Sequence, residues 1–265
     1  MRLTVLGKSP SWQDVGGACS GYLVEDGDTA VVIDCGNGVF GKLRQHIDYV
    51  DVDAVVLSHL HADHFLDLVP YSYALTYAPR QQPVAVPPFW KGTDNPARPR
   101  LIAPSGAREV FRRVVGSWGN DDLIENAFEL EEYEESERPE VGSLRFEFRS
   151  VPHFTETFAI CVGSQNRDGR LGYGADSRPS EELCNFVKGC ELLLIEATLP
   201  RPERTGVRGH LTPEEAGEHA KAAGVERVVI THISDELDHG WAKEQAEKAF
   251  GGTVEVAREG AVYEV

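Results

Sequence analysis

The first third of the chain alternates between short apolar runs and turn-forming residues, a pattern that predicts β-strands. A turn over Asp26–Thr29 precedes a β-branched apolar run, and a glycine-rich segment precedes a predicted helix over Val39–His46. The strands predicted in this part are Leu3–Leu6, Gly21–Glu25, Ala30–Asp34 and Asp53–Leu57. The last of these strands ends immediately before a cluster of histidines.

Apolar strand patterns alternate with helix patterns in the rest of the chain, which predicts an α/β protein. The predicted strands are Leu101–Ala103, Leu144–Val151, Phe158–Val162, Leu171–Gly174, Leu192–Glu196 and Arg227–Thr231. The predicted helices are Ala107–Val115, Ser180–Lys188, Pro213–Ala223 and Ala242–Phe250. Thr212 and Glu215 have the spacing of a capping box at the start of one helix, and Gly224 is a typical residue for its end.

Polar residues follow several of the predicted strands at their carboxyl ends. His59, Glu196 and His232 lie at or just past such ends, and Asp176 follows another closely. A rigid sheet can hold such residues in fixed positions, and α/β proteins commonly build their sites this way. We therefore expect these residues to converge in one functional site.

The segment after Asp53–Leu57 contains four residues of metal-ligand type within six positions: His59, His61, Asp63 and His64. Imidazole and carboxylate groups suit zinc and similar divalent ions. Where a strand gives way to a helix, alternate residues point to one side, so His59 and His61 can share one ion. Asp63 and His64 lie on the next turn and can serve a second ion nearby.

This segment resembles the HxHxDH motif of the metallo-β-lactamase fold superfamily, and further matches follow in family order along the chain. The resemblance assigns His59, His61 and His153 to one ion, and Asp63, His64 and His232 to the other. Asp176 would bridge the two ions, and Asp34 would fix the orientation of ligands. Zinc is the expected metal, with manganese or iron as alternatives.

The resemblance implies an αβ/βα four-layer sandwich in which two mixed β-sheets face each other and helices cover the outer faces. We expect residues 1–104 and 141–265 to supply the two sheets, because candidate ligands come from both parts and must meet. No linker divides the chain, so a single hydrolase domain over residues 1–265 is predicted.

Glu196 and His210, the latter in Gly209-His210-Leu211-Thr212, resemble the ribonuclease Z-like phosphodiesterase branch of this superfamily. In that branch a glutamate and a histidine at these places assist departure of the leaving oxygen, while Asp63 would orient or deprotonate the attacking water. Ribonuclease Z itself has a tRNA-binding arm between the third histidine and the bridging aspartate. Only residues 154–175 lie there in this chain, so the chain is more similar to compact bacterial cyclic-nucleotide phosphodiesterases.

Charge narrows the predicted substrate, because the formal net charge of −17 disfavours binding of extended nucleic acid.

The predicted substrate is therefore a small phosphodiester, with a cyclic nucleotide as the expected example, and a metal-activated hydroxide would attack its phosphorus. Three alternatives remain open. A tRNA 3′-processing endonuclease is opposed by the missing arm and the acidity. An ester, thioester or lactam hydrolase of the same fold is opposed by Glu196 and His210. A non-catalytic scaffold has no physical need for so many convergent ligands.

The cysteines and the lack of long apolar runs predict the compartment of the protein. The five cysteines have no CxxC spacing, so buried reduced thiols are expected, and Cys35 is interpreted as one of them. The N-terminus lacks a signal-peptide pattern and no long apolar run is present, which predicts a cytoplasmic protein without membrane contact. A homodimer is an expectation from the resemblance alone.

A few segments and histidines lie outside the motif. The acidic run 125–140 is interpreted as a solvated helix face or loop, and the proline-rich stretch 79–104 as an irregular insertion that serves as a lid or subunit contact. We expect His46 and His219 on helix surfaces, and His239 is a candidate for the rim of the pocket.

Overall fold

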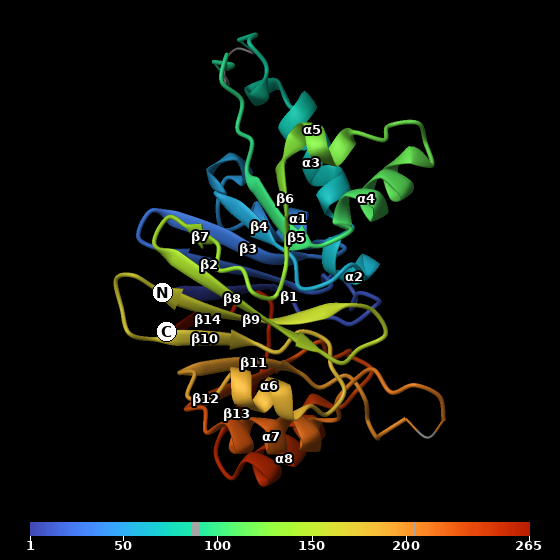
Figure 1. The fold of residues 1–265 in the computed structure, drawn as a ribbon, viewed down its shortest axis with the longest axis vertical. Coiled ribbons are helices and arrows are strands. Elements are labelled where there is room, and N and C mark those ends of the chain that lie inside the picture. The colour runs from blue at the N-terminus through green and yellow to red at the C-terminus, as the bar shows by residue number, and fades with distance from the viewer. Residues whose placement is uncertain (86–90, 204) are drawn as a thin grey trace.

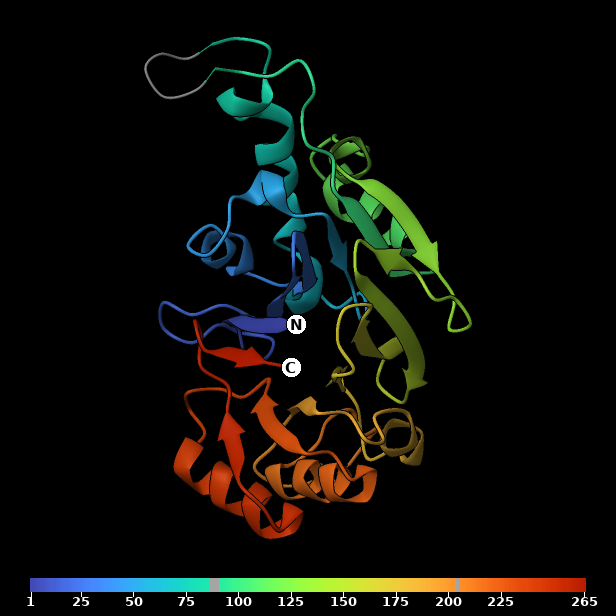
Figure 2. The same ribbon diagram turned by 90° about the vertical axis from the view of Figure 1, so that its left-hand side faces the viewer.

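Two seven-stranded β-sheets face each other in the part of the chain that the structure describes (Figure 1). The computed structural model describes residues 1–85, 91–203 and 205–265. The two ends of the chain meet between the sheets, where the Met1 amino group donates a hydrogen bond to the Val265 carbonyl at 2.8 Å (Figure 2).

The first sheet has the strand order β14-β1-β2-β3-β4-β5-β6. Its strands are β1 (Arg2–Gly7), β2 (Gly21–Asp26), β3 (Thr29–Cys35), β4 (Ala54–Val56), β5 (Arg100–Pro104), β6 (Glu129–Tyr133) and β14 (Val262–Glu264). The strands from β14 to β3 pair antiparallel, and those from β3 to β6 pair parallel. The sheet is therefore mixed, and its parallel half brings several strand ends to one edge.

The second sheet has the order β13-β12-β11-β10-β9-β8-β7 and the same division into two halves. Its strands are β7 (Glu140–Val141), β8 (Leu144–Val151), β9 (Thr157–Ser164), β10 (Arg170–Tyr173), β11 (Leu192–Glu196), β12 (Arg227–Thr231) and β13 (Val254–Val256). The pairs from β7 to β10 are antiparallel, and those from β10 to β13 are parallel.

Alternation along the strands separates the central core from the outer ones. Val31 and Ile33 of β3 face the core between the sheets, whereas Val32 faces the helices on the outer side, because successive side chains of a strand point to opposite faces. Tyr133 and Phe148 stack across the central core with their ring centroids 3.7 Å apart. This contact joins β6 of the first sheet to β8 of the second.

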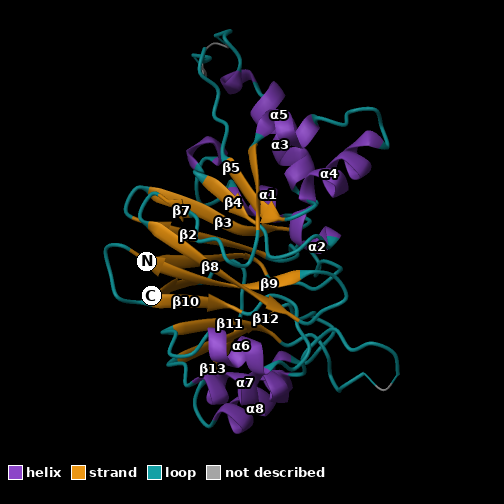
Figure 3. Cartoon of the chain, viewed as in Figure 1, coloured by secondary structure: helices purple, strands orange, loops and turns teal. Residues whose placement is uncertain are grey.

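Helices cover the outer face of each sheet, as Figure 3 shows. Those on the first sheet include α1 (Val39–Leu43), α3 (Leu68–Tyr77), α4 (Ala107–Gly116) and α5 (Leu123–Ala127). Those on the second sheet are α6 (Glu181–Phe186), α7 (Pro213–Ala223) and α8 (His239–Phe250). The predicted four-layer sandwich is confirmed. No helix among the described residues is long and apolar enough to cross a membrane.

The structure corrects several predictions about individual elements. The acidic run 125–140 is not only a helix face or loop, because it contains β6, whose Glu131 pairs with Arg100 of the neighbouring strand. The C-terminal β14 pairs in the first sheet, so not every strand of residues 141–265 belongs to the second sheet. The insertion 79–104 contains a short 3₁₀ helix over Pro79–Gln81 and ends in β5, and its residues 86–90 lie outside the described ranges.

His219 is also corrected, since it lies on α7 but is buried and not on the helix surface. Its Nδ1 donates to the Glu215 carbonyl at 2.7 Å, and its Nε2 accepts a hydrogen bond from the Ser180 amide at 2.9 Å. The ring therefore connects the start of α6 to α7. His46 is exposed, as predicted, but it lies in the turn after α1, which ends at Leu43, and not on a helix.

Candidate metal centre

The connection after β4 carries the four clustered residues of the motif. His59 lies three residues past Val56, the last residue of the strand, and the short helix α2 (Ala62–Phe65) contains Asp63 and His64. His61 is the residue before that helix and has an extended backbone. Gly36 permits this arrangement, because a β-carbon at position 36 would lie 1.8 Å from the Asp63 carbonyl oxygen.

The second sheet contributes three candidate ligands from three separate strand ends. His153 follows β8, Asp176 follows β10 and His232 follows β12. A short antiparallel bridge between His59 and Thr157 connects the two sheets beside the site, where the Phe158 amide donates to the Ser58 carbonyl at 3.0 Å. The long-range fold therefore brings these residues to the motif.

The first group of candidate ligands comprises His59, His61, His153 and Asp176, whose ligand atoms all lie within 4.8 Å of one another. His61 Nδ1 and His153 Nε2 are 3.1 Å apart. Asp176 Oδ2 lies 3.9 Å from His59 Nε2 and 3.8 Å from His153 Nε2. Ligands of a tetrahedral zinc ion with bonds of about 2.0–2.1 Å are separated by about 3.3 Å, so the spacing suits one ion.

The second group comprises Asp63, His64, Asp176 and His232, and all four are buried. His64 Nε2 lies 3.6 Å from Asp63 Oδ2 and 3.4 Å from Asp176 Oδ2. His232 Nε2 lies 3.3 Å and 3.5 Å from the same two oxygens. Asp176 belongs to both groups, which is the position that a bridging carboxylate would occupy.

Unpartnered polar atoms show that these residues fit a cation. His59 Nε2, His64 Nε2 and Asp176 Oδ1 are buried and have no hydrogen-bond partner in the described structure. A buried polar group without a partner destabilises the fold by about 1–3 kcal/mol, so three together require an explanation. Divalent ions bound between the two groups would satisfy all three atoms.

The pKa values of the first group's imidazoles favour metal binding. Burial holds the pKa of His59 well below its ordinary value, and burial also lowers the pKa values of His61 and His153. These rings are therefore neutral at pH 7, the form in which histidine binds a metal.

In the second group, the carboxylates and imidazoles change one another's pKa values. Burial alone would raise the pKa of Asp63, but the hydrogen bond from His232 and the nearby His64 lower it to about 2. Burial alone would lower the pKa of His64, but Asp176 and Asp34 outweigh burial and raise it well above its ordinary value. The carboxylates therefore favour positive charge on the imidazoles of this group. Divalent ions bound here would supply positive charge in the same place.

Asp34 organises the groups behind the motif. Its carboxylate accepts hydrogen bonds from the Ser58 amide at 2.7 Å, the Ser58 hydroxyl at 2.8 Å and the Tyr173 hydroxyl at 2.8 Å. His64 Nδ1 donates to the same carboxylate at 2.7 Å. Since the Ser58 hydroxyl donates to Asp34, its oxygen is left to accept from His59 Nδ1 at 3.0 Å.

These outer hydrogen bonds give four histidines the same orientation. His59 and His64 are held through Nδ1 as described, His153 Nδ1 donates to the Gly209 carbonyl at 2.8 Å, and His232 Nδ1 donates to the Thr198 hydroxyl at 2.8 Å. Each ring therefore directs Nε2 toward the two groups of candidate ligands, where binding of a metal ion would take the place of a proton on that nitrogen.

Glu196 and His210 lie against these groups. Glu196 is the last residue of β11 and accepts a hydrogen bond from His210 Nδ1 at 3.0 Å. It also accepts hydrogen bonds from the Ser177 amide, the Leu211 amide and the Thr198 hydroxyl. Four donors occupy this carboxylate, so Glu196 orients His210 and is a poor candidate for a metal ligand.

His210 is held near the bridging carboxylate. Its Nδ1 lies 3.9 Å from Asp176 Oδ2, and its ring stacks on that of His232 at a centroid distance of 5.5 Å. Burial opposes protonation, but Glu196 raises the pKa of His210 to about 9. The side chain is 15% exposed, so a bound molecule can reach it.

Three residues that support the site were not predicted: Ser58, Tyr173 and Thr198. Ser58 and Thr198 lie one and two residues from predicted site residues, and this proximity was the only signal available for them. Tyr173 lies within the predicted strand Leu171–Gly174 but has no local motif. Their roles depend on tertiary contacts that the residue pattern does not contain.

Backbone geometry also marks the site. The non-glycine residues with positive φ in the described ranges are Asp34, Ala175 and His232, with φ values of 56°, 51° and 51°. Two of them are candidate site residues and the third precedes Asp176. Such conformations are costly for residues with a β-carbon and are concentrated at functional sites.

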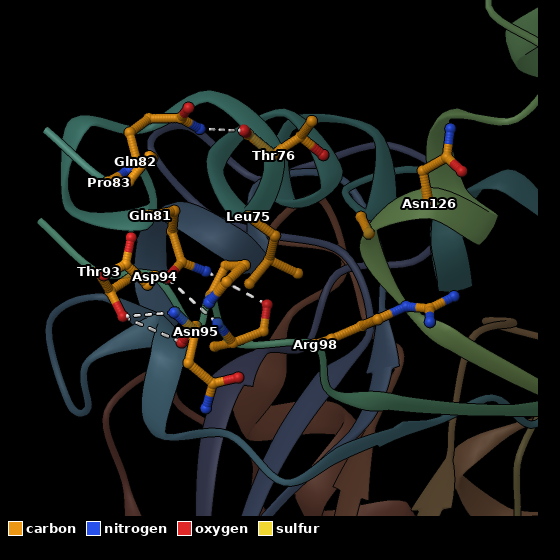
Figure 4. Close-up of a pocket in the computed structure, with 13 residues that line it drawn as sticks. Leu75, Thr76, Gln81, Gln82, Pro83, Thr93, Asp94, Asn95, Arg98 and Asn126 are labelled. Carbon is orange, nitrogen blue, oxygen red and sulfur yellow. Dashed lines mark hydrogen bonds between the residues drawn. The ribbon is translucent and has the colours of Figure 1, made fainter.

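Other candidates belong to neither group of candidate ligands. His239 begins α8 with its Nε2 3.0 Å from the Ser234 carbonyl, and Cys35 is buried. A cavity of about 600 Å³ lies between α3, the segment 93–98 and α5 (Figure 4). Asp94 is the acidic residue of its lining, which contains no histidine or cysteine, so this cavity offers no comparable ligand set.

Comparison with known proteins agrees with this geometry. The profile of the beta-lactamase superfamily domain matches residues 29–233, a range that includes every candidate ligand. The uncharacterized protein Rv1339 of Mycobacterium tuberculosis is 31% identical over 256 residues, covering 96% of this chain and 88% of the relative. Ribonuclease Z of Myxococcus xanthus is 28% identical over 304 residues, covering 100% of this chain and 98% of the relative.

The probable metallo-hydrolase YhfI of Bacillus subtilis is 26% identical over 264 residues and is covered completely, as is this chain. The crystal structure of YhfI, a metallo-beta-lactamase fold protein, superimposes with a TM-score of 0.84 at 24% identity and 99% coverage of both chains. The chain therefore belongs to the beta-lactamase superfamily, as a metallo-hydrolase of that fold related in sequence to a ribonuclease Z.

Proposed function

We propose that the protein is a phosphodiesterase that hydrolyses small nucleotide diesters, with cyclic nucleotides as the expected substrates. The observation that carries this proposal is the Glu196–His210 pair, whose imidazole lies 3.0 Å from the glutamate and 3.9 Å from the bridging Asp176. A ribose oxygen is a poor leaving group and needs a proton as its bond to phosphorus breaks. A histidine that is oriented beside the two groups of candidate ligands would supply that proton.

The candidate ligands would hold two divalent ions. His59, His61 and His153 would hold one divalent ion, Asp63, His64 and His232 would hold the other, and Asp176 would contact both. Ions at these positions would polarise a phosphoryl oxygen and lower the pKa of a water molecule toward neutrality. Zinc suits the histidine-rich ligand set, and manganese and iron are the alternatives.

Asp63 has a second proposed role, which is to orient the attacking water. Its pKa of about 2 leaves the side chain ionised at neutral pH, so its oxygens act as hydrogen-bond acceptors. Asp63 is also the most exposed carboxylate of the second group, with 10% of its side chain accessible. A water that donates a hydrogen bond to Asp63 would be held with a lone pair free to approach phosphorus.

His210 is proposed to deliver the proton to the leaving oxygen. Its Nδ1 is engaged by Glu196, so Nε2 is the nitrogen that remains to donate a proton when the ring is charged. Glu196 would orient the imidazole and stabilise its charged form without contacting the substrate. After the bond to phosphorus breaks, the ring would be neutral and would recover its proton from solvent.

A tRNA 3′-processing endonuclease is the second candidate, favoured by the full-length similarity to a ribonuclease Z. Two features oppose it. The connection between β9 and β10 spans only residues 165–169, and the formal net charge is −17. A protein that binds an extended phosphate backbone normally has excess positive charge on the binding face.

A hydrolysis panel tests the proposal. The metal-loaded protein is compared on cyclic nucleotides, linear dinucleotides, precursor tRNA, a thioester and a β-lactam at equal concentration. We expect cyclic nucleotides to be cleaved most efficiently and precursor tRNA poorly. Efficient, salt-sensitive cleavage of precursor tRNA would favour the endonuclease, and preferential cleavage of the thioester or lactam would reject phosphodiester hydrolysis.

A further inference from the structure

An exposed aromatic residue lies directly beside the candidate metal centre. Phe154 follows the candidate ligand His153, and 53% of it is accessible to solvent. Its ring centroid lies 4.9 Å from that of His153 and 6.0 Å from that of His210. A large apolar side chain left half-exposed between two such residues is available to a bound molecule.

The Phe154 ring is supported on one side by the loop that carries His210. A β-carbon at Gly209 would lie 2.1 Å from the Cε2 atom and 2.4 Å from the Cζ atom of the ring, so only glycine allows the ring this close. The Gly209 carbonyl also accepts the hydrogen bond from His153 Nδ1 at 2.8 Å. The ring thus packs against a backbone that is tied to the metal centre, and its remaining surface faces solvent.

The accessible side of the centre is the side where Phe154 lies. His61, His153 and His210 are only partly buried, whereas all four residues of the second group are buried. A substrate must therefore approach past His61 and His210 to reach the bridging Asp176. Part of any such substrate would lie within reach of the Phe154 ring, 6.0 Å from His210.

We propose that Phe154 is the platform on which the nucleobase of the substrate stacks, an inference that rests on the proposed phosphodiesterase function. In a nucleotide one ribose separates the phosphorus from the base, so a phosphate at the metal centre leaves the base beside the neighbouring ring. Stacking on an aromatic ring accepts every base, because each base has a π-face. The platform would therefore bind purines and pyrimidines with little preference for hydrogen-bonding pattern.

Binding measurements test this platform without relying on turnover. Metal-loaded protein is titrated calorimetrically with adenosine 5′-monophosphate and with ribose 5-phosphate, which lacks the base. Phe154→Ala should weaken binding of the nucleotide by roughly 5- to 150-fold and leave binding of the sugar phosphate unchanged. In kinetics the same variant should raise the KM for a cyclic nucleotide but not for the methyl riboside cyclic phosphate.

Further variants separate stacking from simple packing. Phe154→Leu retains an apolar side chain against Gly209 but lacks a π-face, so it should behave like the alanine variant. Phe154→Tyr and Phe154→Trp should retain nucleotide binding to within about threefold. Tyr77→Ala is the matched control, because Tyr77 is 63% exposed on α3, which carries no candidate site residue.

Three outcomes would overturn the proposal: equal weakening of both ligands, unchanged nucleotide binding in Phe154→Ala, or full retention in Phe154→Leu. A change of oligomeric state in Phe154→Ala with nucleotide binding unchanged would assign the ring to a subunit contact instead. Base-dependent binding through Phe154 without hydrolysis of any diester would support the platform and reject the phosphodiesterase proposal, so the two failures are distinguishable.

Discussion

The two sheets build the candidate centre in different ways. The first sheet supplies four residues from one short connection after β4, so their proximity follows from the chain itself. The second sheet supplies single residues after β8, β10 and β12, and these meet only because the strand ends lie at one edge. The first contribution is local, whereas the second depends on the whole fold.

The chemical roles are divided along the same line. Three of the five candidate metal-binding histidines, His59, His61 and His64, follow a strand of the first sheet. His210, the proposed proton donor, and its partner Glu196 belong to the second sheet. Asp176 also comes from the second sheet but contacts ligands from both. Substitutions of the motif residues should therefore impair metal binding, whereas those of Glu196 and His210 should impair proton donation. The predictions below test that division.

The largest effect is expected for Asp176→Ala, since this carboxylate alone belongs to both ligand groups. Substitution of residues that merely support a metal ligand weakens metal binding by about 10–100-fold, so loss of a shared ligand should exceed that range. Metal analysis after dialysis should show a greater loss than in any single histidine variant. Glu131→Gln, in an ion pair on β6, is the control and should retain metal. A smaller loss than in His59→Ala would remove Asp176 from the bridging position.

The next effect concerns the leaving group. His210→Ala should slow hydrolysis of a nucleotide diester by about 10²–10⁴-fold, the usual contribution of general acid catalysis. Bis-nitrophenyl phosphate should be slowed far less, because nitrophenolate departs readily without a proton. Metal content should be unchanged, and the exposed His46→Ala variant should match the wild type on both substrates. Equal losses on the two substrates would show that His210 positions the substrate or supports the metals.

Glu196→Gln should show the same leaving-group selectivity with a smaller loss of rate. The amide can still contact the His210 ring, but it does not stabilise the charged imidazole as a carboxylate does. The ratio of kcat/KM for the two diesters is the quantity to measure. If Glu196→Gln loses metal instead, the glutamate would belong to the ligand set.

Asp34→Asn tests the local side of the centre. Asp34 accepts hydrogen bonds from Ser58, Tyr173 and His64, and an asparagine offers only one oxygen for these donors. We expect metal affinity to fall by about 10–100-fold, mainly at the ion held by His64. Tyr173→Phe removes a single donor and should have a smaller effect. Unchanged metal affinity in Asp34→Asn would contradict the orienting role.

The smallest effect is expected for Thr198→Val, which removes a hydroxyl at nearly constant volume. That hydroxyl contacts both Glu196 at 2.6 Å and His232 Nδ1 at 2.8 Å, so it connects the proton donor's partner to a metal ligand. A combined loss of about 1 kcal/mol from these hydrogen bonds corresponds to roughly a three- to tenfold decrease in kcat/KM. Thr198→Ser should restore the wild-type rate, and failure to do so would mean that the methyl group matters instead.

The same division explains what the sequence could predict. The local motif identifies His59, His61, Asp63 and His64 from spacing alone, because the connecting segment is short. His153, Asp176 and His232 become candidates only through family order behind that motif. Thr198 and Tyr173 have no local pattern, and their hydrogen bonds depend on strands that are distant in sequence.

The fold shows a similar limit at particular elements. The long central strands and the capped helix α7 were predicted, whereas β13 and β14 are only three residues long and were not. The helix α3 was missed because apolar and aromatic residues lie on all its sides, so it has no helical period of polar positions. The strand β6 was missed because three of its five residues are glutamates, which are uncommon in strands; Glu131 is accommodated by its ion pair with Arg100.

The most direct test of the account is the number of metal ions bound by each chain in protein that is loaded with zinc and freed of excess metal. The two ligand groups, which share Asp176, predict close to two ions per chain, with loss of both in Asp176→Ala. One ion or none in well-folded protein would contradict the binuclear centre on which the proposed function depends.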